Sequence, residues 1–502
     1  MIDCSNVTAV DLIKKIKSAH KKEFQPNQRI VIYYTKGLPH TQQNIQTILN
    51  VIDISNFFVC VVSTQDYQNV ISTDSIPFNF IKVDGQFDLI NNNELPVTRE
   101  DIIRQSNSLL EDTPELLANS KHFCMAPWVH LFVGTQGEAR LCCSQYDTIG
   151  SVTENSLSEL QNNNKIDTIR NQLKQDLPIT GCERCYKEES LGRSSSRIAF
   201  NQKYGHHYDR VENNLPTLLH WDFRFSNLCN LSCRSCGPQS STSWYKPAKV
   251  IGVDKPQYVC NDNSVYKQLL EYVDQVEEIY FAGGEPLIMP EHYAVLNKLI
   301  ELGRTDVRLV YNTNLTEVSF KGQSVFDLWN KFDNVAVCAS LDASNERGEY
   351  LRCGTNWKTI EDNRQAMIDA CPDIYFWVSA TTGMINALHV PDFHRDWVER
   401  GLINPENFNI QNIYDPDYMR VDRATAELRD LIVSKYISHL EWLEPSDVEG
   451  RATQGYKGII NYLSNLKGFD KDLFWSNIKP LDEYYGVDLL DAFPELDILP
   501  KP

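Results

Sequence analysis

Six short runs rich in Val, Ile, Phe and Tyr lie between residues 218 and 414, with helical segments between them. The runs are LLHWDFRF, EEIYFAGGEP, VRLVYNTN, NVAVCASLD, IYFWVSATT and NFNIQNIY. Strands that alternate with helices in this way are typical of α/β proteins with a parallel sheet. We therefore predict a parallel α/β barrel with ligand groups at the carboxyl ends of its strands, where the loops share one mouth.

The first hundred residues show a second alternation of helices and strands. Apolar residues repeat at helical spacing over 9–19 and again over 45–52, and RIVIYY and FFVCVV have the composition of strands. This pattern predicts a small α/β domain over residues 1–100, whose role the sequence does not show. The polar segment 84–120 is interpreted as a connector.

Three cysteines stand in one loop directly after the first of the six runs. They are Cys229, Cys233 and Cys236, in the spacing Cys-x3-Cys-x2-Cys, and a curled loop of this length can aim all three sulfurs at one point. Iron–sulfur clusters are normally held by four thiolates, so three leave one iron of a four-iron cluster open to a substrate or cofactor. Zinc is the alternative, but the loop offers no fourth ligand nearby.

Polar residues also stand at the ends of the next two strands. Gly283 and Gly284 let the backbone approach a ligand closely, and Glu285 supplies an anionic acceptor. Thr313 and Asn314 end the third strand. Taken alone, the GGEP segment also fits a tight turn.

The fourth strand ends at Ser340 and Asp342, which the period-two alternation of a strand places on the same side. Arg352 follows in YLRCGTNW and offers a planar, bidentate fork to a carboxylate, and Arg347 is a close second candidate. The alternative for each is a strand-end hydrogen bond or a solvated loop charge.

The loop CNLSCRSC, followed about fifty residues later by FAGGEP, resembles the radical S-adenosylmethionine (SAM) enzymes. The resemblance implies a partial (β/α)6 barrel over 206–440 and a 4Fe-4S cluster on Cys229, Cys233 and Cys236. In this family the open iron chelates SAM, and reductive cleavage yields a 5′-deoxyadenosyl radical that abstracts a substrate hydrogen. The family commonly has an aromatic residue where this chain has Ser235, so the adenine contacts must come from elsewhere.

The same resemblance assigns expected roles to the strand-end residues. The GGE segment is expected to face the amino group of the methionine moiety, and Arg352 is expected to pair with its carboxylate. The residues expected to bind SAM are Gly283, Gly284, Glu285, Thr313, Asn314, Ser340, Asp342 and Arg352.

A second set of cysteines precedes this loop and comprises Cys124, Cys142, Cys182 and Cys185. Alternating apolar residues predict a hairpin between the first two. One or two helices, opened by a capping box of Ser156 and Glu159, are predicted between Cys142 and Cys182. The spacing fits a structural zinc site as well as an iron–sulfur cluster.

This set resembles the twitch or SPASM auxiliary-cluster module of radical SAM enzymes, here placed before the radical domain instead of after it. The resemblance implies a second 4Fe-4S cluster, saturated by Cys124, Cys142, Cys182 and Cys185, with Cys143 as the alternative to Cys142. The expected organisation is then 1–100 (α/β), 115–205 (auxiliary module), 206–440 (radical SAM core) and 441–502 (C-terminal cap).

The composition of the chain narrows the class of protein to which these sites belong. The chain has 502 residues and a net charge of −19, which argues against a broad nucleic-acid-binding face. It shows neither a signal peptide nor an apolar run of about 18 residues, so we expect a cytoplasmic protein without a membrane partner. Its 14 cysteines are then expected to be metal ligands and free thiols, not a disulfide framework.

The leading functional hypothesis is a radical SAM enzyme, an oxidoreductase or a peptide- or metabolite-modifying enzyme. Its auxiliary cluster would transfer an electron or anchor the substrate. A peptide is the first expectation for the substrate, because the extra N-terminal domain could recruit one, and a small molecule or nucleotide follows closely. A reductant such as flavodoxin or ferredoxin is the expected partner. The alternative of another class is a non-catalytic iron–sulfur or zinc scaffold.

Overall fold

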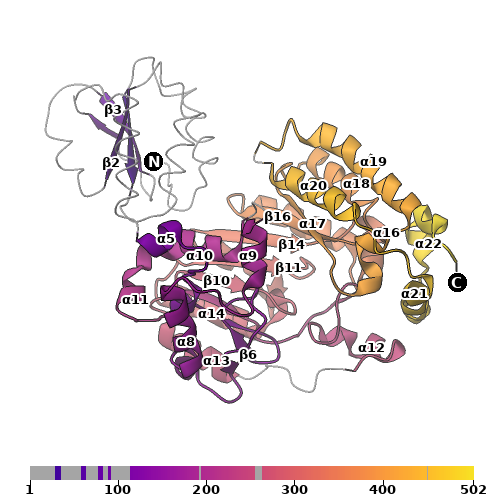
Figure 1. Ribbon diagram of the computed structural model, residues 1–502. Helices are drawn as coiled ribbons and strands as arrows, with labels where there is room; N and C mark the ends of the chain where they lie inside the picture. Colours follow the sequence, from indigo (N-terminus) through magenta and orange to yellow (C-terminus); the bar gives the residue numbers. More distant parts are fainter. Residues whose placement is uncertain are drawn as a thin grey trace. The chain divides into compact units, whose positions relative to one another are not determined.

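The structure is a computed structural model that describes residues 114–190, 194–254, 263–448 and 450–501, together with four strands nearer the N-terminus (Figure 1). These strands are β1 (Arg29–Tyr34), β2 (Phe58–Ser63), β3 (Pro77–Lys82) and β4 (Leu89–Asn91). They form a sheet in the order β2-β1-β3-β4, in which β1 is parallel to both β2 and β3. The two predicted strands are thus confirmed, whereas the predicted helices over 9–19 and 45–52 lie outside the described residues.

The chain divides into two compact units. The first unit holds residues 1–130, 141–147 and 161–217, and the second holds 131–140, 148–160 and 218–502. All four cysteines of the auxiliary set belong to the first unit, and Cys229, Cys233 and Cys236 belong to the second. Each cysteine set is therefore built within one unit.

The second unit is organised around an open sheet of nine strands. In spatial order they are β17 (Phe408–Asn412), β16 (Tyr375–Thr382), β14 (Val335–Ser340), β11 (Arg308–Thr313), β10 (Glu278–Phe281), β8 (His220–Phe223), β5 (His130–Val133), β6 (Glu138–Arg140) and β7 (Gly150–Ser151). The six predicted strands are all present, and β8, β10, β11, β14, β16 and β17 pair in parallel with their neighbours in that series. Because β17 and β7 are edges, the sheet is a partial barrel, as expected.

The hairpin predicted before Cys142 supplies the remaining strands. β5 and β6 pair antiparallel, and Gly137 turns the chain between them with a φ of 83°. β6 in turn pairs antiparallel with β7. The hairpin thus extends the parallel sheet of the second unit, although the cysteines on either side of it belong to the first.

Burial of apolar strands against helices explains why the centre of this sheet is stable. β14 reads VAVCAS, and its first five residues are buried, as is typical of a parallel strand covered on both faces. The helices that follow the strands include α14 (Pro290–Glu301), α16 (Asn345–Leu351), α17 (Trp357–Ala370) and α18 (Val390–Glu399). Asn356 caps α17 by accepting a hydrogen bond from the backbone N–H of Thr359.

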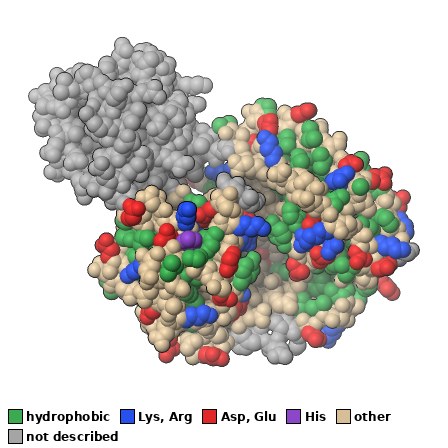
Figure 2. Space-filling model, viewed as in Figure 1, with side chains coloured by type: hydrophobic (Ala, Val, Ile, Leu, Met, Phe, Trp, Pro, Cys, Tyr) green, Lys and Arg blue, Asp and Glu red, His purple; other side chains and the backbone are tan. Residues whose placement is uncertain are grey.

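Four helices end the chain: α19 (Ala426–Leu443), α20 (Arg451–Leu463), α21 (Lys471–Tyr485) and α22 (Leu489–Ala492) (Figure 1). α20 packs against β17 so closely that a Cβ added to Gly455 would lie 3.2 Å from Cβ of Ile410. In the described part of the chain, none of the helices is long and apolar enough to cross a lipid bilayer. Acidic and basic side chains are interspersed over the face drawn in Figure 2.

The described residues of the first unit that follow β4 are mainly helical. Their helices include α6 (Ala126–Val129), α8 (Asn164–Lys174), α9 (Glu183–Ser190) and α10 (Ser196–Tyr204). Asn163 caps α8 by accepting hydrogen bonds from the N–H groups of Lys165 and Ile166.

The predicted capping box is confirmed in the second unit, at the start of α7 (Leu157–Gln161). Ser156 N donates to Glu159 Oε2 at 2.8 Å, and Glu159 N donates to Ser156 Oγ at 3.2 Å.

Removing apolar volume from the sheet should destabilise the second unit. Leu309 of β11 is fully buried between β10 and β14, so Leu309→Ala is expected to lower the free energy of unfolding by about 2–5 kcal/mol. Leu431→Ala is the control, because Leu431 on α19 is 45% exposed and its loss should change that free energy by at most about 0.5 kcal/mol. Urea unfolding followed by circular dichroism measures both, and equal effects would contradict the assigned burial.

Candidate functional site

The loop after β8 is held by hydrogen bonds to the backbone carbonyls of its cysteines. Cys229 O accepts a hydrogen bond from Ser243 Oγ at 2.8 Å, and Cys233 O accepts one from the indole Nε1 of Trp244, also at 2.8 Å. Cys236 N donates to Cys233 O at 2.9 Å, which curls the loop between the second and third cysteines. Residues 242–245 form a short 3-10 helix, η3, so one turn of helix fixes two of the three cysteines.

Burial makes the thiolate form of these cysteines unfavourable in the absence of a cation. It raises the pKa of Cys229 to about 11, and the nearby Glu285 and Cys236 add to the effect. Burial also raises the pKa of Cys233 and of Cys236, although the guanidinium of Arg352 opposes both shifts. Thiols crowded in this way are suited to a cationic metal centre, which would supply the missing positive charge.

Arg352 lies directly against this loop. β15 (Arg352–Cys353) pairs antiparallel with β9 (Ser232–Cys233), so that Arg352 stands opposite Cys233. Its Nη1 lies 3.7 Å from Cys233 Sγ, and its Nη2 lies 2.9 Å from Oδ2 of the buried Asp342. Burial alone would lower the pKa of Arg352, but Asp342 and Cys233 outweigh it and raise that pKa. Arg347, the second candidate in the sequence, instead pairs with Glu495 through two contacts of 2.7 and 3.0 Å.

Glu285 joins the ends of β10 and β11. Its Oε1 accepts hydrogen bonds from Thr313 Oγ1 at 2.7 Å and Leu287 N at 3.1 Å, and its Oε2 accepts one from Asn314 N at 2.7 Å. Burial raises the pKa of Glu285 to about 7, although these three donors oppose the shift. The structure thus brings together Glu285, Thr313 and Asn314, which the sequence suggested only one by one.

The two glycines before Glu285 pack beneath the cysteine loop. Gly284 has a φ of 55°, and a Cβ at this position would lie 2.3 Å from the carbonyl oxygen of Leu228. Glu285 N donates to the same oxygen at 2.7 Å. Gly283 has a φ of 83°, and an added Cβ would meet the side chain of Arg224 at 2.7 Å. Only glycine therefore fits where the strand end meets the loop.

Asn314 holds the other end of the loop. Its Nδ2 donates to Asn230 Oδ1 at 2.9 Å and lies 4.0 Å from Cys229 Sγ. Asn230 also donates to Thr316 Oγ1 at 2.8 Å. Asn230 and Thr316 were not among the predicted site residues, because nothing in their local sequence distinguishes them from ordinary loop residues.

Ser340 and Asp342 follow on the next strand. Ser340 ends β14 and is half-buried, whereas Asp342 is buried and its Oδ1 accepts a hydrogen bond from Thr381 N at 2.9 Å. Asp342 therefore contacts both Arg352 and the end of β16. All eight residues expected to bind SAM lie at the carboxyl ends of adjacent strands or in the β15 segment beside the cysteine loop.

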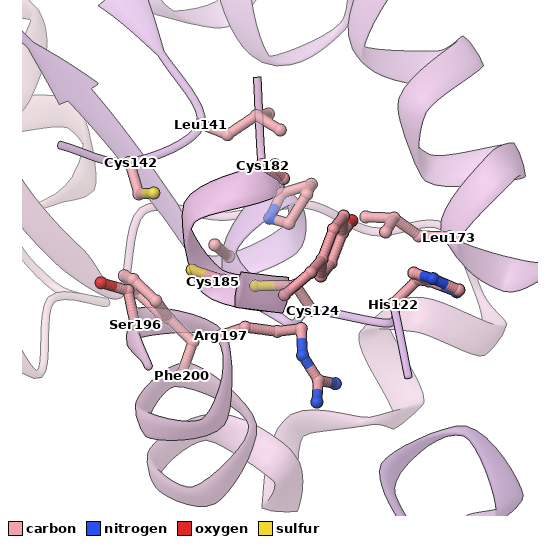
Figure 3. A pocket seen from close by; sticks show the side chains of 13 residues that line it. His122, Cys124, Leu141, Cys142, Leu173, Cys182, Cys185, Ser196, Arg197 and Phe200 are labelled. Carbon is pink, nitrogen blue, oxygen red and sulfur yellow. The ribbon is translucent and has the colours of Figure 1, made fainter. Parts of the chain in front are cut away.

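The second cysteine set lines a pocket in the first unit (Figure 3). Cys124 precedes α6, Cys142 follows β6, and Cys182 and Cys185 lie at the start of α9. Figure 3 shows the sulfur atoms of Cys124, Cys142 and Cys185 pointing into the same space. Cys143 is exposed and does not line the pocket.

Burial raises the pKa of cysteines in this pocket as well. Burial raises the pKa of Cys142 and of Cys182 to about 12, and neighbouring cysteines add to both shifts. Burial likewise raises the pKa of Cys124, with further contributions from Cys142, Cys182 and Cys185. The thiols of Cys124, Cys142 and Cys182 are therefore all disfavoured as thiolates in the absence of a cation.

Arg197 lines the same pocket but has protein partners of its own. Its Nε and Nη2 donate to the carboxylate of Glu189 at 2.9 and 2.5 Å, and its Nη1 donates to Phe123 O at 2.9 Å. Because Phe123 immediately precedes Cys124, this ion pair fixes the position of that cysteine. The pairing joins α9 to α10 and was not evident from the sequence.

Both cysteine sets offer thiol donors and no other ligand type. Thiolates are the usual ligands of iron–sulfur clusters, and they also bind structural zinc. The donor set of each site therefore fits an iron–sulfur cluster.

Comparisons with known proteins agree with this chemistry. Residues 223–392 match the radical SAM superfamily, and residues 124–186 match an iron–sulfur cluster-binding domain. No curated protein matches the chain.

Solved structures with similarity to the chain include anSMEcpe with bound AdoMet (17% identity, TM-score 0.33, covering 45% of this chain and 58% of that one). They also include SuiB of Streptococcus suis bound to S-adenosylmethionine (16% identity, TM-score 0.32, covering 56% and 62%). The chain thus spans less than two thirds of the length of each.

Substituting Gly284 should disturb the cysteine loop through its contact with Leu228. Gly303→Ala is a matched control, because Gly303 has a φ of 71° with nothing within 4 Å of an added Cβ. We expect Gly303→Ala to cost about 1–2 kcal/mol of unfolding free energy, from backbone strain alone. Gly284→Ala should cost more and should also lower the iron bound at the loop after reconstitution. Equal stability and equal iron content in the two variants would contradict the proposed close contact.

Proposed function

We propose that this chain, which carries a radical SAM domain preceded by an iron–sulfur cluster-binding domain, is an enzyme that cleaves SAM reductively and abstracts a hydrogen from its substrate. The observation that carries the proposal is the loop of Cys229, Cys233 and Cys236, held at the carboxyl ends of the parallel strands. Three thiolates leave one iron of a four-iron cluster without a protein ligand. When bound there, the cluster and SAM supply the electron and the radical chemistry.

The chain's own residues would bind and orient SAM beside this cluster. Gly283 and Gly284 let the strand end approach the cysteine loop closely, and Glu285 holds Thr313 and Asn314 in place. Ser340 and Asp342 would line the cofactor from the next strand. Arg352 lies beside Cys233 and pairs with Asp342, and it would also meet the carboxylate of SAM.

The second cluster would be held by Cys124, Cys142, Cys182 and Cys185. Four thiolates saturate a four-iron cluster and leave no iron open to SAM. This site would therefore accept an electron or anchor the substrate, and the radical would be generated at the three-cysteine loop. The position of Cys143 outside the pocket favours Cys142 as the ligand.

A peptide is the substrate that we favour. The strands β1 to β4 form a sheet of their own, N-terminal to both cofactor domains, and this part of the chain could recruit a macromolecular substrate. A small molecule or nucleotide is the alternative substrate. The electron would come from a cytoplasmic flavodoxin or ferredoxin.

Loss of one loop cysteine tests the reaction directly. Anaerobically reconstituted protein with dithionite and SAM should release 5′-deoxyadenosine, and Cys233→Ala should reduce that release to the background rate, because two thiolates cannot retain an active cluster. Cys143→Ala is the control and should release as much as the unchanged protein. A protein that binds iron but releases no 5′-deoxyadenosine would be the non-catalytic scaffold, and the proposal would fail.

The auxiliary ligands can be assigned by counting iron. The unchanged protein should bind about eight irons per chain, and Cys182→Ala about four, if each site holds a four-iron cluster. Cys182→Ala should still cleave SAM, uncoupled from substrate turnover, whereas Cys143→Ala should keep about eight irons. If Cys143→Ala loses iron and Cys142→Ala does not, the assignment of these two neighbours must be reversed.

A further inference from the structure

The residue between the second and third loop cysteines is tied to the C-terminal helices. Arg234 is buried, and its Nη2 donates to Oδ1 of Asp482 in α21 at 2.6 Å. Its Nε donates to Tyr350 O at 3.0 Å, and its guanidinium carbon lies 3.9 Å from the centre of the Tyr350 ring. Arg234 thus has its charge neutralised by a residue 248 positions further along the chain.

Asp482 is held in place by contacts on both oxygens. Its Oδ1 also accepts a hydrogen bond from Tyr350 Oη at 2.9 Å, and its Oδ2 accepts one from Leu489 N at 3.0 Å. The Leu489 contact links α21 to the start of α22. The carboxylate that faces Arg234 is therefore fixed by two elements besides its own helix.

A second polar contact lies one turn further along α21. Tyr485 Oη donates to Ser232 Oγ at 2.6 Å, on the other side of Cys233 from Arg234. Leu481 of the same helix packs with the buried Trp244, and Cys236 and Tyr485 pack against this cluster. One face of α21 therefore contacts the loop both before and after Cys233.

We propose that Asp482 is a positioning residue, which fixes Cys233 and Cys236 for cluster binding by neutralising Arg234 from α21. Arg234 directly follows Cys233 and precedes Cys236 by two positions. The contacts that hold Arg234 therefore also restrain the backbone that carries both cysteines. Removing one partner of a buried ion pair leaves an uncompensated buried charge, which is strongly unfavourable and drives the other partner toward water. The inference deepens the proposed function and rests on it only for the identity of the cluster.

Alkylation of the cluster-free, reduced protein tests the inference without SAM chemistry. The variant is Asp482→Asn, and the control is Glu483→Gln, which changes the exposed neighbouring carboxylate on the same helix. Iodoacetamide labelling followed by mass spectrometry should show Cys233 and Cys236 reacting at least about tenfold faster in Asp482→Asn. Cys338, which is buried in β14, reports unfolding of the whole second unit and should not change.

Reconstituted protein supplies the second readout. Asp482→Asn should retain about four irons at the auxiliary site and lose the electron paramagnetic resonance change that SAM induces, and Asp482→Glu should restore part of that change. A parallel rise in the labelling of Cys338, or no difference from Glu483→Gln, would overturn the inference.

If Asp482→Asn does not fold, Tyr350→Phe removes only the hydrogen bond from Tyr350 Oη that orients Asp482 Oδ1. It should then raise the labelling of Cys233 and Cys236 without that of Cys338. Unaltered labelling of both cysteines in that variant would overturn the inference as well. If the variants show the expected labelling but the unchanged protein does not cleave SAM, that result would count against the proposed function alone.

Discussion

The burial of three thiols in one loop is the constraint on which the second unit depends. Burial disfavours each thiolate and raises the pKa of all three thiols, that of Cys229 to about 11. Arg352 is a cation in contact with Cys233, but most of its charge is already balanced by Asp342. The loop is therefore arranged for a positively charged centre, and its geometry must come from contacts that do not involve the sulfurs.

Those contacts come from different parts of the chain and act on different cysteines. Asn314 of the β11 end holds Asn230 and approaches Cys229. The pairing of β15 with β9 holds Cys233, and α21 holds the segment from Cys233 to Cys236 through Arg234. Because each ligand has its own anchor, the backbone of all three cysteines is restrained by contacts that do not depend on a bound cluster.

Sequence reasoning succeeded where the signal is local. The six parallel strands and the capping box at Ser156 could be predicted, because alternation and capping depend on residues a few positions apart. The two cysteine sets were also recognisable from their spacing. The sequence could not show how the second set comes together, because its four cysteines come from three separate segments.

Pairings between distant residues were the part that could not be predicted. Arg352 looked equally suited to a ligand carboxylate or to a protein partner, and only the fold places it between Asp342 and Cys233. Arg234 gave no signal at all, since a basic residue between two cysteines is ordinarily solvated. Its burial against Asp482 shows that the C-terminal helices complete the environment of the cysteine loop. A chain that ended at β17 would contain all three cysteines and every residue expected to bind SAM, but it would leave Arg234 without its counter-ion.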